Sequence, residues 1–152
     1  MSTIMRKMNM ISRCEALYRA QQLEEDLAGI YHSYILVICR KPGMSQDWLA
    51  KYLCVNKSSV TRHLANLEKR GYIERKVCAE DKRELLVYPT QKMLDIREEV
   101  VRITREWNAL VSEGLTEEEL MLFHSILQKM ADKSQEIIYG GAPEHENSTA
   151  IS

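Results

Sequence analysis

The sequence predicts a mainly α-helical protein with a small β-hairpin wing, and three observations on residues 45–90 lead to this fold class. Two amphipathic patterns of helical period follow each other closely, over residues 46–53 and 57–70. Residues 72–77 and 85–88 are then rich in strand formers. The polar stretch CAEDKRE between them cannot be core, so it forms the tip of a hairpin. Helix, turn, basic helix and hairpin in this order are typical of a winged helix-turn-helix lobe.

Capping residues and breakers support each of these boundaries. Side chains that can accept a hydrogen bond from the first turn stand just before three of the predicted helices. Glycine and proline stand where the chain must leave a helix or a strand. The expected N-caps are Ser45, Asn56 and Thr90, and the expected breaks are Pro42, Gly43, Gly71 and Pro89.

Helices on both sides of the lobe predict a scaffold for dimerisation. Before the lobe, residues 8–24 and 30–41 have helical patterns. Behind it, apolar side chains recur every three to four residues and form a coiled-coil-like seam that is longer than a small lobe requires. After Gly114, a capping box of Thr116 and Glu119 begins a last helix. The seam consists of Met93, Ile96, Val100, Ile103, Trp107 and Leu110, and the last helix has Leu120, Phe123, Leu127 and Met130.

These patterns divide a single domain, residues 1–152, into parts. We expect dimerisation helices at residues 8–41 and 91–138, around a winged helix-turn-helix lobe at 45–90. From residue 140 the sequence GGAPEHENSTAIS has the composition of a disordered tail. No apolar run approaches the length of a membrane span, and the N-terminus has no apolar signal core. The sequence therefore predicts a cytoplasmic protein that does not insert into a membrane.

The net charge of −1 hides an uneven distribution. Between Lys57 and Arg83, eight basic residues stand against four acidic ones, so this segment is +4 and the remainder is −5. A basic lobe on an acidic body suits a protein that turns one face towards phosphates. Charge alone favours an ordinary solvated surface, and it is the helix-turn-helix pattern that favours DNA.

The second helix of this motif carries the side chains that we expect to contact DNA. Ala50 is small where the two helices cross, and Val60 fills the inner face of the second helix. The opposite face presents hydrogen-bonding groups to the major groove, where base edges can be distinguished. We expect Ser58, Thr61 and Arg62 at base edges and Lys57 and Ser59 at phosphates.

Three segments carry a resemblance to a known family. They are SQDWLAKYL, VNKSSVTRHLANLEKRGYIERK and AEDKRELLVYPT, and the flanking helices extend the likeness over nearly all of residues 8–138. These segments resemble the MarR family, the multiple antibiotic resistance regulators. The resemblance implies a triangular homodimer held by its terminal helices, with a pseudo-palindromic double-stranded DNA operator as partner. It also implies a repressor, because most members of the family repress transcription.

The wing segment Asp81-Lys82-Arg83 matches the Asp-x-Arg signature of that family. An arginine at a hairpin tip suits the minor groove, where negative potential is focused. Asp81 can hold the guanidinium of Arg83 by a charge-assisted hydrogen bond. By spacing alone a surface ion pair is equally compatible, and the resemblance favours the wing role. Two departures stand out: Cys54 replaces the usual glycine of the turn, and His63 replaces an aliphatic residue.

The resemblance further implies an effector pocket between the dimer helices and the lobe, suited to a small aromatic or amphipathic ligand. Aromatic and polar side chains on the first, second and fifth predicted helices are candidates for its walls. At helical spacing such side chains are more often core, and both interpretations stay open. The candidates are Tyr18, Tyr31, His32, Tyr34 and Trp107.

A thiol switch is the rival mechanism, because some members of the family sense oxidants through cysteine. The four cysteines have no paired spacing and are expected to be free thiols in a reducing compartment. Cys14 and Cys78 are the redox candidates, since basic residues lie near both in sequence. Cys39 and Cys54 fit buried, inert thiols best. We expect release from DNA by a ligand and not by oxidation.

Other classes of function find less support in the sequence. No nucleophile elbow, zinc-protease helix, P-loop or dinucleotide fingerprint is present, so neither an enzyme nor a cofactor is expected. The four histidines lack close ligand spacing, so no metal site is expected either. A winged helix that docks a protein instead of DNA is the alternative from another class. The basic second helix and Arg83 argue against it.

Overall fold

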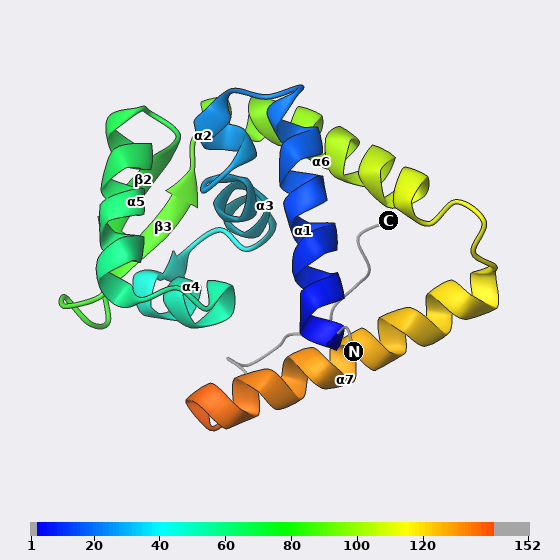
Figure 1. Cartoon of the computed structure of the whole chain (residues 1–152). Helices are drawn as coiled ribbons and strands as arrows, with labels where there is room; N and C mark the ends of the chain where they lie inside the picture. Colours follow the sequence, from blue (N-terminus) through cyan, green and yellow to red (C-terminus); the bar gives the residue numbers. More distant parts are fainter. Residues whose placement is uncertain (1–2, 142–152) are drawn as a thin grey trace.

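The computed structural model describes residues 3–141 and confirms a mainly helical fold with a small antiparallel sheet (Figure 1). The central lobe contains β1 (Met44–Ser45), α4 (Gln46–Leu53), α5 (Lys57–Lys69), β2 (Ile73–Val77) and β3 (Leu85–Pro89). Helices α1 (Ile4–Ala20), α2 (Glu25–Ala28) and α3 (His32–Arg40) come before the lobe. Helices α6 (Gln91–Val111) and α7 (Glu117–Tyr139) follow it.

Local hydrogen bonds explain why the helices of the lobe begin where they do. The Ser45 hydroxyl accepts a hydrogen bond from the backbone N–H of Trp48 at 3.1 Å. The side-chain oxygen of Asn56 accepts one from the N–H of Ser59 at 2.8 Å. Both predicted N-caps are therefore confirmed, and Gly71, with φ of +78°, leaves α5 in the expected left-handed conformation.

The capping box of α7 is also confirmed, whereas the cap of α6 differs from the prediction. Thr116 accepts from the N–H of Glu119, and the Glu119 carboxylate accepts from the N–H of Thr116. Thr90 stands at the N-cap position of α6, but its side chain accepts no hydrogen bond from that helix. Its hydroxyl lies 2.6 Å from the carbonyl oxygen of Gly71, so it ties the start of α6 to the entrance of β2.

Three elements differ from the sequence-based expectation. The first helix begins at Ile4 instead of residue 8, because Thr3 caps it by accepting from the N–H of Arg6. The short helix α2 was not expected. Strand β1 adds a third member to the hairpin, giving the order β1-β3-β2, with Met44 opposite Val87. Two residues are too few to show alternation in the sequence.

One hydrophobic core joins the lobe to the scaffold. Helix α3 lies at its centre and packs against α6 and β3. Ile35 and Ile38 of α3 are fully buried, together with Leu64 and Leu67 of α5. The inner stripe of α5 therefore faces the core, as predicted, and its opposite face is left to solvent.

The terminal helices expose much of their apolar surface. None of the residues of α7 is buried, and this helix has no extensive packing partner among the described elements. Figure 1 shows α7 running back from the end of α6, past the beginning of α1 and towards α4. The large apolar residues that α7 exposes are Met121, Leu122, Phe123, Ile126, Ile137 and Ile138.

The tail predicted from residue 140 lies, from residue 142 on, outside the described residues, and Gly140 is the C-cap of α7. No helix in the described part of the chain is both long and apolar enough to cross a membrane.

Candidate nucleic-acid interface

The first half of α5 presents the predicted contact residues on one accessible surface. Lys57, Ser58, Thr61 and Arg62 are exposed, and Ser59 is half-buried. They are brought together because the apolar stripe of this helix is buried against the core, which turns the polar face outward. The residues have the types that bind phosphates and base edges.

Several of these side chains already have partners within the protein. The Ser58 hydroxyl donates to the side chain of Asn56 at 2.8 Å, and the Thr61 hydroxyl donates to the carbonyl oxygen of Lys57 at 3.0 Å. The Lys57 ammonium lies 3.1 Å from Asp47, but both side chains are mostly exposed. Such an exposed ion pair is weak and can exchange for a phosphate contact.

The wing tip has the arrangement expected for its Asp-x-Arg signature. Asp81 accepts from the backbone N–H of Arg83 at 3.0 Å and from its Nε at 3.3 Å. The aspartate therefore orients the guanidinium, as predicted. The Arg83 side chain is 92% exposed, and Lys82 beside it is exposed as well. The backbone N–H and Nε of Arg83 are thus bonded to Asp81, while the rest of its guanidinium group stays exposed and free to donate to DNA.

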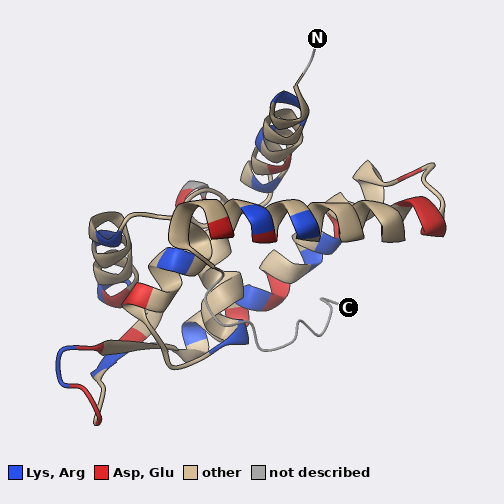
Figure 2. Cartoon of the chain, turned by 90° about the horizontal axis from the view of Figure 1, so that it is seen from below, with Lys and Arg blue, Asp and Glu red and all other residues tan. Residues whose placement is uncertain are grey.

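The wing tip and the first turn of α5 lie at the same end of the lobe (Figure 1). The direction of the chain explains this, because α5 runs away from α4 and the antiparallel hairpin then returns to that end. Figure 2, a view from below, shows that the loop of the wing carries both basic and acidic residues. A reading helix beside a wing with an exposed arginine at its tip can contact neighbouring grooves of one duplex.

Two contacts join α5 to the scaffold helices, and the sequence analysis predicted neither of them. The Tyr34 hydroxyl of α3 lies 2.9 Å from Nδ1 of His63 on α5. At the other end of the helix, the Arg70 guanidinium contacts Asp26 at 3.2 Å and Glu24 at 3.4 Å. His63 as a departure from the family pattern was the sequence signal for the first contact. Nothing in the local sequence pointed to the second.

The five predicted pocket residues make packing contacts within the chain, and their role in an effector pocket stays a prediction. The rings of Tyr18 and Trp107 are in contact, with centroids 5.5 Å apart. Tyr31 and Tyr34 are buried and pack against His63. His32 is buried elsewhere. These side chains therefore occupy three separate packing contacts.

His32 is held in an unusual environment for a histidine. Its Nε2 lies 3.2 Å from the Thr104 hydroxyl. Burial, followed by the nearby charge of Arg19, lowers the pKa of His32 to about 4. Arg19 is itself buried, and its Nε donates to the carbonyl oxygen of Ala28 at 2.9 Å. His32 is thus neutral at neutral pH and helps to join α3 to α6.

The four cysteines are free thiols, and their exposure differs in part from the expectation. Cys39 is half-buried, and burial raises its pKa to about 11, which fits an inert thiol. Cys54 was expected to be buried, but it is exposed. The reason is its place at the C-cap of α4, where it adopts a left-handed conformation with φ of +54°. Of the redox candidates, Cys14 is exposed and Cys78 is half-buried.

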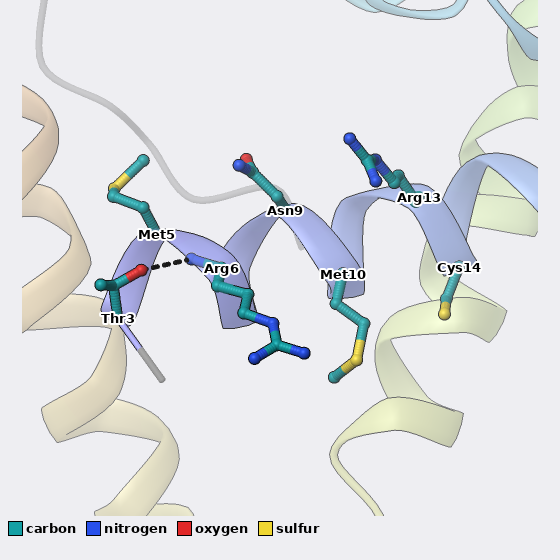
Figure 3. A pocket seen from close by; sticks show the side chains of 7 residues that line it. All are labelled: Thr3, Met5, Arg6, Asn9, Met10, Arg13 and Cys14. Atoms are coloured by element: carbon teal, nitrogen blue, oxygen red, sulfur yellow. Dashed lines mark hydrogen bonds between the residues drawn. The ribbon is translucent and has the colours of Figure 1, made fainter. Parts of the chain in front are cut away.

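An open cavity of about 540 Å³ lies along the beginning of α1. None of the five predicted pocket residues lines it. Figure 3 shows that Met10 and Cys14 extend from one side of the helix, and Asn9 and Arg13 from the other. The remaining lining residues are Thr3, Met5 and Arg6. Among the described residues, no group of three or more histidine, cysteine or acidic side chains could hold a metal ion.

Comparison with known proteins shows which family this arrangement resembles. A family model described as MarR family matches residues 25–84. The transcriptional regulator SlyA is 26% identical, with a TM-score of 0.81 over 89% of this chain and 96% of that one. A MarR protein from Peptoclostridium difficile is also 26% identical, with a TM-score of 0.82 over 89% of both chains.

A third similar structure was solved with DNA. It is a MarR family transcriptional regulator from Listeria monocytogenes complexed with a 26mer DNA, 25% identical, with a TM-score of 0.82 over 95% of this chain and 100% of that one. The structural matches span the lobe and its helical scaffold together. The lobe thus matches the MarR family model, and the whole chain has the fold of MarR and SlyA transcriptional regulators.

Proposed function

We propose that this chain is a homodimeric repressor that binds a pseudo-palindromic DNA operator and is released from it by a small-molecule effector. The observation that carries the DNA-binding part is the joint exposure of the first half of α5 and the wing tip at one end of the lobe. The Listeria relative solved with DNA supports the same function for this fold.

The proposed contacts fall into three groups. Arg62, assisted by Ser58 and Thr61, reads base edges in the major groove. Lys57 and Ser59 contact phosphates, which fixes the register of the helix on the duplex. The wing residues Lys82 and Arg83 enter the minor groove, with Asp81 orienting the arginine.

The apolar faces of the terminal helices support a homodimer. A helix of 23 residues without a buried side chain is not stabilised by its own chain. A second copy covers such faces most simply, because a two-fold axis brings the same helices together. It also sets two reading helices about one helical turn of DNA apart, roughly 34 Å.

Selection of DNA from a random duplex library tests the proposed function. We expect the wild type to enrich a two-fold symmetric sequence, with affinity that falls steeply as salt rises. Arg62→Ala should weaken binding and relax base preference, at a cost of about 1–3 kcal/mol if its contact is bidentate. Arg83→Ala should weaken binding most at sites with a narrow minor groove.

A variant outside the interface provides the control. Lys129→Ala removes an exposed positive charge from α7 and should leave DNA binding unchanged. If the wild type enriches no sequence and binds random duplexes without salt dependence, the proposed function is wrong and a lobe that docks a protein becomes the better interpretation.

Effector release can be tested with the selected duplex. A ligand releases DNA only if it binds more tightly to a dimer whose reading helices do not fit the operator. We expect a small aromatic or amphipathic ligand, with benzoate as the first probe, to lower operator affinity in a titration followed by fluorescence anisotropy. Unchanged affinity across a panel of aromatic and amphipathic probes would contradict release by this class of ligand.

A thiol switch is the second candidate, because Cys14 is exposed and lies with Arg6 and Arg13 along the same cavity. Nearby positive charge and access both favour a reactive thiolate. The test compares mild peroxide treatment of the wild type and of a variant in which all four cysteines are replaced by alanine. If peroxide releases the operator from the wild type and not from the variant, oxidation is the signal.

A further inference from the structure

The Arg75 side chain makes the most extensive set of polar contacts between the wing and the helices of the lobe. Its Nε lies 3.1 Å from one carboxylate oxygen of Glu68, and its Nη2 lies 3.1 Å from the other. Its Nη1 donates to the side-chain oxygen of Gln46 at 3.0 Å. One side chain of β2 therefore joins the beginning of α4 to the last turn of α5.

The positive charge of Arg75 is paired with a carboxylate of the same chain and is largely shielded from solvent. The Arg75 side chain is 18% exposed, in contrast to 92% for Arg83 at the wing tip. Hydrogen bonding from Arg75 is the main cause that lowers the pKa of Glu68, so this carboxylate is ionised at neutral pH. A two-pronged contact between guanidinium and carboxylate restricts direction as well as distance.

The position of Arg75 along β2 makes this contact important for the wing. Ile73, Arg75 and Val77 share the face of β2 that is turned towards the helices, because side chains alternate along a strand. Ile73 is buried, whereas Val77 is 58% exposed. Arg75 is thus the last side chain on this face of β2 that packs against the helices before the hairpin tip.

We propose that Arg75, held by Glu68 and Gln46, is a positioning residue that sets the angle of the wing against the reading helix and contacts no DNA phosphate. This inference rests on the proposed function. An arginine at the wing tip and a helix in the major groove must fit the duplex together. A wing that rocks about its base must be ordered on binding, at the expense of affinity and of selectivity for groove shape.

Removing the Glu68 charge separates this role from simple electrostatics. Glu68→Gln raises the positive charge of the lobe, so electrostatics alone predicts tighter DNA binding. The positioning role predicts poorer discrimination instead. Arg75→Lys gives a second test, because lysine keeps the charge but cannot reproduce the two-pronged contact. Arg75→Gln removes both charge and contact. Lys76→Gln, on the neighbouring exposed residue, is the matched control for loss of charge.

The experiment uses the full chain and two duplexes. One is the sequence that the wild type selects from a random library, and the other has its flanking A·T pairs replaced by G·C to widen the minor groove. The ratio of the two affinities at fixed salt measures flank preference. We expect all three changes at Glu68 and Arg75 to reduce this ratio, by about three- to tenfold if the contact resembles other charge-assisted pairs. Lys76→Gln should keep it.

The dependence of affinity on salt gives the second readout. We expect Arg75→Gln to leave its slope unchanged. A slope lower by about one, with flank preference intact, would make Arg75 a phosphate contact and overturn the inference. If Glu68→Gln raised the affinity for both duplexes by the same factor, the positioning role of Arg75 would be wrong. It would also be wrong if the wild type bound both duplexes equally well. Thermal unfolding verifies that each variant is folded. Because Glu68 is exposed, its replacement should not disrupt the core. If the wild type selects no duplex, the proposed function itself fails.

Discussion

The hydroxyl of Tyr34 and Nδ1 of His63 lie 2.9 Å apart, so the scaffold helix α3 and the reading helix α5 share a hydrogen bond. The two rings meet edge to face, with an interplanar angle of 88°. Burial raises the pKa of Tyr34 to about 12, so its hydroxyl keeps its proton. Burial and the charge of Arg62 lower the pKa of His63, which favours a neutral imidazole as acceptor.

Replacing Tyr34 tests how much this hydrogen bond contributes to stability. Tyr34→Phe keeps the ring but leaves Nδ1 of His63 without a partner, so we expect the free energy of unfolding to fall by about 1 kcal/mol. Urea denaturation measures the change. In a double-mutant cycle with His63→Leu, the two losses should not add, because both variants break the same bond. Full additivity would show that the two residues are not coupled.

The depressed pKa of His32 predicts how stability depends on pH. The folded protein holds this group neutral down to a pKa of about 4, whereas the unfolded chain binds a proton near 6.5. The unfolded state therefore takes up protons first as the pH falls. The stability contributed by neutral His32 is fully present above pH 6.5 and is lost between there and pH 4.

Urea denaturation at several pH values measures this dependence. His32→Gln replaces Nε2 by an amide nitrogen that does not titrate, so we expect a shallower loss of stability over that range. His124→Gln, an exposed position on α7, should keep the slope of the wild type. If the wild type and His32→Gln lost stability equally steeply between pH 6.5 and pH 4, His32 would not be the cause of this pH dependence.

The exposed face of α7 predicts that one charge can separate the subunits. Phe123 is 49% exposed in the single chain. Phe123→Asp should shift the dimer towards monomers, because a carboxylate buried at an apolar interface loses its hydration. Analytical ultracentrifugation at micromolar concentration measures the shift. Ser125→Asp adds the same charge at an exposed polar position and should have the smaller effect. A wild type that sediments as a monomer would rule out the proposed dimer.

Cys54 occupies a backbone conformation that glycine adopts more easily. Its φ of +54° is the only positive value for a non-glycine residue in the described chain. Cys54→Gly relieves the contact between Cβ and the backbone, so we expect the melting temperature to rise, with a gain of up to about 1 kcal/mol. Cys54→Val should lower it, since a branched side chain fits this conformation poorly. A drop in melting temperature for Cys54→Gly would contradict this account.

Much of the lobe could be predicted because its signals are local. Ser45, Asn56 and Gly71 act within one turn of the chain, and the inward stripe of α5 repeats with the helical period. The contact at the wing tip is also local and could be predicted, because Asp81 and Arg83 are two residues apart. Elements without such signals were missed. Strand β1 consists of two residues, and it is recognised only by its pairing with β3.

Local sequence patterns were enough to predict the main helices, the hairpin, the caps of α4, α5 and α7 and the exposed polar face of α5, since short-range geometry specifies all of these. Only the tertiary structure decided which partners the remaining polar groups find. Arg75 was counted as one more charge of a basic lobe, yet packing brings it to Gln46, 29 residues away. The contacts of the predicted pocket residues likewise arise from packing between distant elements, α1 with α6, α3 with α6 and α3 with α5. Contacts between residues far apart in the chain depend on how whole elements pack, and no local pattern encodes them.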